Sequence, residues 1–177
     1  MPDPKYEFTA VSRLDAEAIG QPGKRTFRIL VDSGSSTAVI WLEKDQLFQL
    51  ALAVHQLAAT TEESEDSQPG EPPTENEAPP RTRLEFKAGR IVLRHDGARS
   101  LFLVDAHEEE EAENETAPAL IRFWSPRALM EVFAEEALKV CAAGRPLCPL
   151  CGGPIDPEGH KCPRTNGHFQ LTGVPKA

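Results

Sequence analysis

Three of the four cysteines and one histidine lie in a single segment of fifteen residues near the end of the chain. The segment reads CPLCGGPIDPEGHKC and runs from Cys148 to Cys162. Thiolate sulfur and imidazole nitrogen are ligands that zinc binds tetrahedrally, and the two-residue gap between Cys148 and Cys151 lets one tight turn present both sulfurs to the same ion. The sequence therefore predicts a zinc site.

The predicted ligands are Cys148, Cys151, His160 and Cys162. His168 is a competitor for the fourth position, but Gly159 frees the backbone beside His160, and the shorter loop costs less closure entropy. Four protein ligands leave no open position for water, so we expect structural rather than catalytic Zn²⁺. The remaining cysteine, Cys141, falls on a predicted helix and is expected to be a small core residue.

Residue patterns predict two successive sets of strands, each followed by one helix. Strands are expected over residues 6–11, 26–31 and 37–42, with a helix over 44–59 whose apolar stripe is Leu47, Leu50, Ala51, Val54 and Leu57. The second set has strands over residues 83–93, 99–104 and 119–124. Ser125 is the expected N-cap of the last helix, with Pro126 at its first position and Gly144 ending it.

The two sets resemble each other in sequence. Residues 25–32 resemble 99–105, and residues 38–47 resemble 119–128. A duplicated β-β-β-α unit explains this, although hairpin-plus-helix units also resemble one another by chance, and both explanations stay open. We expect an α+β fold with a mainly antiparallel sheet, two helices and a small C-terminal zinc knuckle. The expected divisions are 1–59, a linker at 60–80, 81–144 and the zinc-knuckle tail at 145–177.

Half of the acidic residues lie in two short segments. The chain has a formal net charge of −9, but residues 60–80 and 105–116 carry seven acidic groups each, and the remainder has a net charge of +5. Such segments are usually solvated and self-repelling, so we expect loops there and a disordered linker at 60–80. Asp105 and His107 open the second segment, where a solvated loop is a better interpretation than a cation site.

Composition narrows the classes of function. No run of apolar residues is long enough to span a membrane, and the grouped cysteines suit a reducing compartment, so we expect a cytoplasmic protein without a membrane partner. The first hypothesis is a non-enzymatic binding or adaptor protein with an unknown protein partner or small anionic ligand. The alternative is an enzyme that acts on a small phosphorylated or anionic substrate in a cleft lined by Arg25, Arg94 or Arg122.

Nucleic-acid binding ranks third among the hypotheses. Six basic residues fall between positions 81 and 99, but the only aromatic residue among them, Phe86, is assigned to the core by the strand alternation. Without exposed aromatic side chains on which bases can stack, nucleic acid is not the expected partner.

Three motifs together resemble a known family. They are GQPGKRTF at residues 20–27, LEKDQ at 42–46 and the cysteine-rich segment from Cys148 to His168. They are similar to the domain of unknown function 3090 family, DUF3090, of uncharacterised bacterial proteins, mostly from actinobacteria and chloroflexi. The resemblance implies a compact cytoplasmic protein with a zinc-ribbon-like end, and it implies no activity. The acidic segments at 60–80 and 108–113 are longer than the resemblance leads us to expect.

Overall fold

The structure is a computed structural model that describes residues 2–21, 23–61, 81–143, 148–151 and 162. The chain divides into two compact units. The first comprises Met1–Gly20 and Lys24–Cys141, and the second comprises Gln21–Gly23 and Ala142–Ala177. Nearly all of the predicted linker at 60–80 lies outside the described residues.

The first unit contains a seven-stranded sheet and two helices, which confirms the predicted α+β class. The strands are β1 (Tyr6–Phe8), β2 (Val11–Ile19), β3 (Thr26–Ser33), β4 (Ser36–Leu42), β5 (Arg83–Asp96), β6 (Leu101–Glu108) and β7 (Ile121–Pro126). The helices are α1 (Lys44–Thr60), α2 (Arg127–Ala142) and the short 3-10 helix η1 (Glu109–Glu111).

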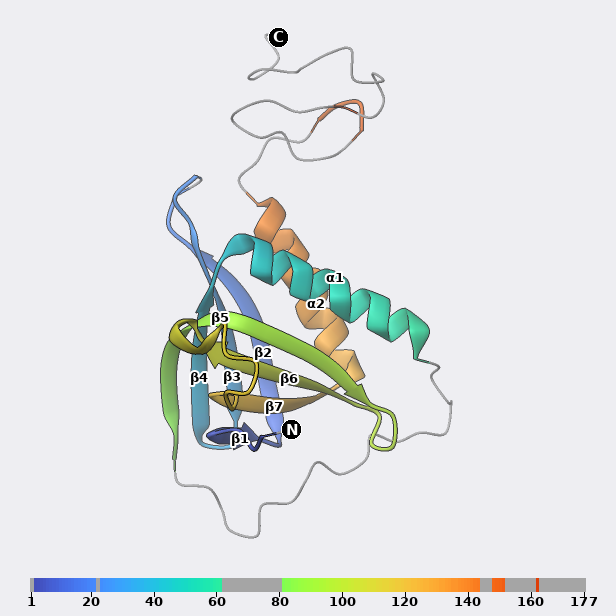
Figure 1. The fold of residues 1–177 in the computed structure, drawn as a ribbon. Helices are drawn as coiled ribbons and strands as arrows, with labels where there is room; N and C mark the ends of the chain where they lie inside the picture. Colours follow the sequence, from blue (N-terminus) through green and yellow to red (C-terminus); the bar gives the residue numbers. More distant parts are fainter. Residues whose placement is uncertain (1, 22, 62–80, 144–147, 152–161, 163–177) are drawn as a thin grey trace. The chain divides into compact units, whose positions relative to one another are not determined.

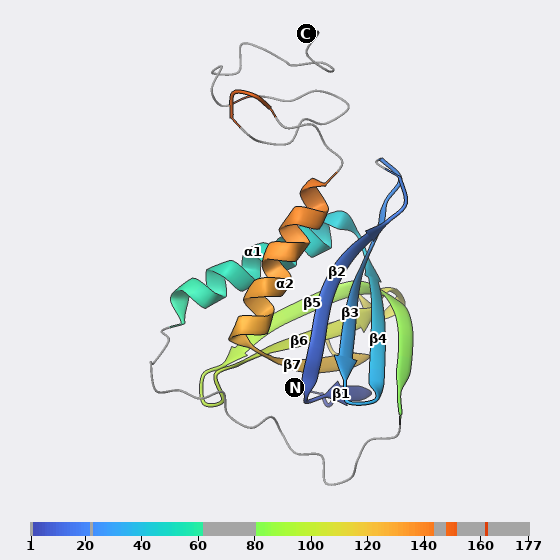
Figure 2. The same ribbon diagram turned by 180° about the vertical axis from the view of Figure 1, so that it is seen from behind.

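The sheet curls until its two ends meet. Its strand order is β1-β7-β6-β5-β4-β3-β2, yet only Thr9 and Ala10 separate β1 from β2 along the chain. Strands β2, β3 and β4 form one antiparallel meander, and β5, β6 and β7 form another. Parallel pairing joins β4 to β5 and β1 to β7, so the seven strands form one strongly curled sheet, called the barrel below, with both helices on one side of it (Figures 1 and 2).

The two halves of the barrel repeat each other in detail. Each meander has a bulge at the same place in its first strand, between Val11 and Arg13 in β2 and between Ala88 and Arg90 in β5. Strands β1 and β2 of the first repeat together correspond to the long strand β5 of the second. Strand β1 pairs in parallel with β7, just as the start of β5 pairs in parallel with β4. The barrel is therefore built from two β-β-β-α repeats, each of which begins against the last strand of the other.

The helices repeat the same burial pattern. The buried residues are Leu47, Leu50, Ala51, Val54 and Ala58 in α1 and Met130, Phe133, Ala134, Ala137 and Cys141 in α2. These two sets have identical spacing, and they pack with the inward side chains of the sheet in one core. The predicted core position of Cys141 is confirmed. No helix in the described part of the chain is long and apolar enough to cross a membrane.

One side chain ties the two helices together. Arg127, the first residue of α2, donates hydrogen bonds to the carbonyl oxygens of Ala58, at 2.8 Å, and Thr61, at 2.9 Å. These carbonyls end α1, which has no basic residue in its own last turn. A guanidinium there satisfies orphan acceptors and complements the helix dipole, so α2 supplies the cationic cap that α1 lacks.

Several predicted boundaries are wrong. The first strand ends at Phe8, and the chain then forms the nine-residue strand β2, which the sequence did not single out. Strand β2 contains Asp15, Glu17 and two alanines, which are poor strand formers, and its pairing with β3 overrides this propensity. The predicted N-cap is also wrong: Ser125 pairs with Phe102 within the sheet, and α2 begins at Arg127.

The second acidic segment is not entirely a loop. Strand β6 continues through Glu108, so Asp105 and His107 lie within the sheet, and both are buried. Only from Glu109 onward does the chain leave the sheet, first as η1. The expectation of a solvated loop over all of 105–116 is therefore wrong for its first residues.

A close contact at the bulge of β5 gives the first prediction. A Cβ atom at Gly89 would lie 2.5 Å from the Cβ of Ala112 and 2.7 Å from the Cα of Glu109. We expect Gly89→Ala to lower the free energy of unfolding by about 1–3 kcal/mol, because either the backbone of β5 or the segment at Glu109 and Ala112 must move. Chemical denaturation measures this change. Gly97→Ala is the matched control, since no atom lies within 4 Å of its Cβ position; equal stabilities would contradict the contact.

Candidate metal centre

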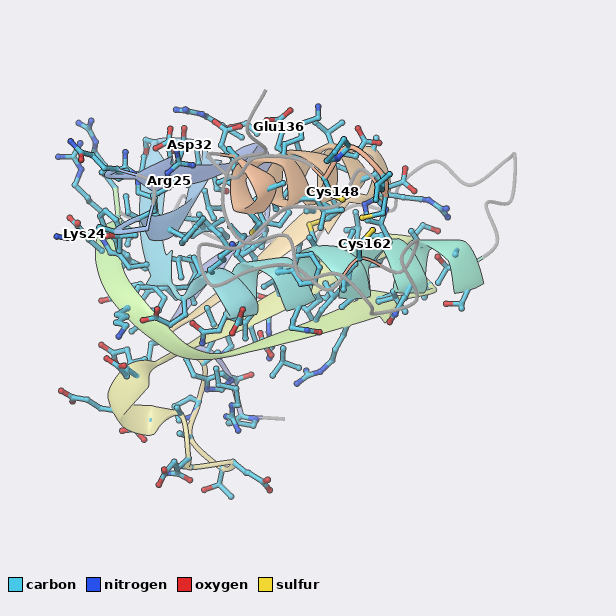
Figure 3. All side chains as sticks on the ribbon, turned by 90° about the horizontal axis from the view of Figure 1, so that it is seen from above. Lys24, Arg25, Asp32, Glu136, Cys148 and Cys162 are labelled. Atoms are coloured by element: carbon cyan, nitrogen blue, oxygen red, sulfur yellow. The ribbon has the colours of Figure 1, made fainter. Side chains whose placement is uncertain are left out.

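The cysteines of the second unit lie around one point. Residues Pro149–Cys151 form a turn, so Cys148 and Cys151 stand at its two ends. Cys148 and Cys162 are buried, Cys151 is half-buried, and the three side chains pack against one another (Figure 3 labels two of them). The three thiols form the only cluster of at least three potential metal-ligating side chains among the residues described.

The spacing of the sulfur atoms fits a shared tetrahedral ion. All three sulfurs lie within 4.8 Å of one another, and the Sγ atoms of Cys148 and Cys162 are 3.8 Å apart. Zinc–sulfur bonds of about 2.3 Å place two ligands of a tetrahedron about 3.8 Å apart. A disulfide requires an S–S distance of about 2.0 Å, and none of the three cysteines is disulfide-bonded.

The turn also favours the metal-binding form of Cys148. The backbone N–H of Cys151 and, more weakly, that of Leu150 donate to this sulfur and lower the pKa of the Cys148 thiol to about 6. The side chains of Cys151 and Cys162 act in the same direction, while burial opposes them. The thiolate is the form that binds metal, so the turn prepares Cys148 for coordination near neutral pH.

The structure brings together three of the four predicted ligands. Cys148, Cys151 and Cys162 lie close enough to hold one ion. His160 and His168 both lie outside the described residues, so the choice of His160 stays a prediction. The clustered cysteines were identifiable from their local spacing alone.

The arginines proposed for an anionic cleft do not form one group. Arg94 and Arg122 both contact Asp105, through Nη1–Oδ2 and Nε–Oδ1 distances of 3.3 and 2.7 Å. Arg25 belongs instead to the first half of the barrel, immediately before β3 (Figure 3). Asp105 is the common partner of Arg94 and Arg122, and the charge pattern of the sequence wrongly placed it in a loop.

The fold and site define a barrel of two β-β-β-α repeats followed by a cysteine-rich candidate metal module. The sequence model of a family described as "Protein of unknown function (DUF3090)" matches residues 6–162, and the chain belongs to this family. No curated protein and no solved structure matches the chain significantly.

Proposed function

We propose that this chain is a zinc-binding protein of the non-enzymatic binding or adaptor class. Cys148, Cys151, His160 and Cys162 hold the ion in a closed structural site. The observation that carries the proposal is the convergence of three cysteine sulfurs within 4.8 Å, none of them in a disulfide. Thiols that remain reduced and bind metal suit the cytoplasm, which is the location we propose.

The donor set supports zinc and His160. Three thiolates and one imidazole form a soft, tetrahedral set, which suits zinc better than oxygen-preferring ions such as Mg²⁺ or Ca²⁺. The family match extends to Cys162, so it includes His160 and leaves out His168. A site closed by His160 contains all its ligands within the matched region.

The adaptor role follows from a closed site. Four protein ligands leave no coordination position for a reacting water, so the metal fixes the shape of the module instead of doing chemistry. Leu150, whose residue surface is 51% exposed, stands between the first two ligands on the turn. In this proposal the ion holds the turn rigid, and a partner protein contacts the surface that the turn presents.

Metal content tests the proposal. We expect purified protein to contain one zinc ion per chain by elemental analysis, and Cys148→Ser to lose it because three ligands and a serine hydroxyl bind zinc far more weakly. Cys141→Ser is the matched control, since Cys141 is also buried but lies outside the cluster.

The histidine variants then identify the fourth ligand. We expect His160→Ala to lose its zinc at a lower chelator concentration than the wild-type protein does. His168→Ala should lose zinc at the same chelator concentration as wild type. The reverse order would replace His160 by His168 as the ligand. A wild-type protein that binds no zinc even when it is refolded with the metal would refute the proposed function.

A further inference from the structure

The outer face of the second repeat carries a buried charged cluster. Asp105 is only 3% exposed, and Arg122 donates to its two oxygens over 2.7 and 3.0 Å. Arg94, on the neighbouring strand β5, approaches the same carboxylate at 3.3 Å. Asp105 therefore holds two guanidinium groups in fixed positions.

The first repeat shows that the barrel does not require these charges. Asp105 and Arg122 are cross-strand partners in β6 and β7, and the corresponding partners in β3 and β4 are Leu30 and Val39. A buried ion pair is often no more stabilising than an apolar pair of similar size, because both charges lose their hydration. The first repeat fills this position with an apolar pair, so the fold does not explain the charged pair in the second repeat. Asp105 and Arg122 are therefore candidates for a functional role.

A second difference between the repeats removes a carboxylate. Arg13 follows the bulge of β2 and makes two ion pairs, a close one with Asp15 on its own strand and a longer one, of 3.7 Å, with its cross-strand neighbour Asp32. The corresponding residue of β5 is Arg90, but its cross-strand neighbour is His107, whose Nδ1 lies 3.2 Å from Arg90 Nη2. The arginine is kept, but both of its negative partners are replaced: Asp32 corresponds to His107, and Asp15 corresponds to Val92.

The imidazole does not balance this charge. His107 is 6% exposed, and burial, together with the charge of Arg90, lowers its pKa, so it is neutral near pH 7. Arg90 makes no ion pair with any carboxylate in the described parts of the chain, and its buried Nε has no hydrogen-bond acceptor there. Arg90 is therefore a half-buried cation that lacks the carboxylate partner present at the matching position of the first repeat.

Nearby acidic groups are mostly engaged elsewhere. Glu7 accepts a hydrogen bond from the indole of Trp124 at 2.8 Å, and Asp96 pairs with Arg99 at 2.8 Å. Asp3 lies near enough to Arg122 to raise its pKa, but it acts less strongly than Asp105. Arg90 donates to the carbonyl of Asn114, whose exposed neighbours Glu113 and Glu115 make no ion pair with it. Around His107, the positive charge of the arginines therefore exceeds the negative charge of the described acidic groups that pair with them.

We propose that Arg90 and Arg94 bind a small oxyanion, a carboxylate or a phosphate group, on the outer face of β5 beside His107. Both arginines lie on the same face of β5, with the outward Val92 between them. Asp105 is the cross-strand neighbour of Val92, so the side chain of Arg94 contacts Asp105 diagonally, on the side nearer to Arg90. The side chain of Arg94 is 39% exposed, so a ligand can reach it. The ligand replaces the carboxylate that Asp32 gives Arg13, while Asp105 and Arg122 are positioning residues.

The test uses the full-length, zinc-loaded protein and follows the His107 ring by NMR during titration with inorganic phosphate and, separately, acetate. We expect saturable shifts with at least one of them and a higher apparent pKa of His107 in the bound state. Saturation by phosphate alone assigns a phosphate-class ligand, and saturation by acetate alone assigns a carboxylate. If neither anion produces a saturable shift, the proposal is wrong.

Two variants test the residues. His107→Asp gives Arg90 one of the two internal carboxylate partners that Arg13 has, the one at the position of Asp32. We expect this variant to keep the fold and to weaken anion binding by about tenfold or more. Binding to this variant is followed by heteronuclear NMR of the arginine side chains. Arg90→Gln should have the same effect, whereas Arg13→Gln, at the matched position of the first repeat, should bind as wild type does. Unchanged affinity in Arg90→Gln would overturn the assignment. Zinc content is measured in every variant, so failure of this site is separate from failure of the metal site.

Discussion

Asp105→Leu is expected to lower the free energy of unfolding by about 3–5 kcal/mol, because it leaves a buried guanidinium without its partner. The side chain of Arg122 is almost fully enclosed and directs both of its bonds at Asp105. Arg94 is less affected, since its partly exposed side chain can turn toward water. Urea denaturation followed by circular dichroism measures the loss.

The first repeat supplies the control for this prediction. Adding Arg122→Val to Asp105→Leu reproduces the Leu30–Val39 pair at the same position of the second repeat. We expect the double variant to recover most of the lost stability, since no unpaired charge remains buried. If the double variant is as unstable as Asp105→Leu alone, the destabilisation comes from packing or local strain, and our account of the ion pair is wrong.

The helices could be predicted well because their signal is local. Leu47, Leu50, Ala51 and Val54 recur at helical spacing, and all four are buried in α1. The fifth member of the predicted stripe, Leu57, is only partly buried, and its neighbour Ala58 faces the core. A pattern defines the buried face of a helix, whereas the angle at which the helix crosses the sheet decides its last buried residue.

The repeat could be detected from the sequence, but not aligned correctly. The sequence similarity aligns Arg25 with Arg99, and therefore Phe27 with Leu101. Strand pairing instead makes Phe27 equivalent to Phe102 and Trp41 equivalent to Trp124. The two tryptophans confirm this register, since each donates its indole N–H to a glutamate on the next parallel strand, Glu85 or Glu7. The connection after β6 is much longer than that after β3, so similarity read straight along the chain loses the register.

The buried charges could not be found from composition. Asp105 stands beside a run of glutamates, and a count of charge assigns it to their loop. Its partner Arg122 is seventeen residues away and becomes its neighbour only when β6 and β7 pair. The cysteines show the opposite case, because the turn that joins Cys148 to Cys151 brings their sulfur atoms together without any distant contact.

Chelation of the metal is expected to release the Cys148–Cys151 turn while the barrel stays folded. The only hydrophobic cluster described in the second unit consists of the three cysteine side chains themselves. Without a cation, three clustered thiolates would repel one another, so in the proposed zinc-bound form the metal takes the place of a hydrophobic core. The barrel keeps its own core, which includes both helices and contains none of these cysteines.

Hydrogen exchange distinguishes the two units. The amides of Leu150 and Cys151 donate to the sulfur of Cys148, and we expect them to exchange about a hundredfold faster or more after chelation. Amides in β3 and β6 should keep their protection, and the Cys141→Ser variant should respond as wild type does. Two results would count against this account: continued protection of the turn after metal loss is verified, or unfolding of the barrel together with the turn. The second result would mean that zinc stabilises the whole chain, because a core independent of the metal predicts local opening only.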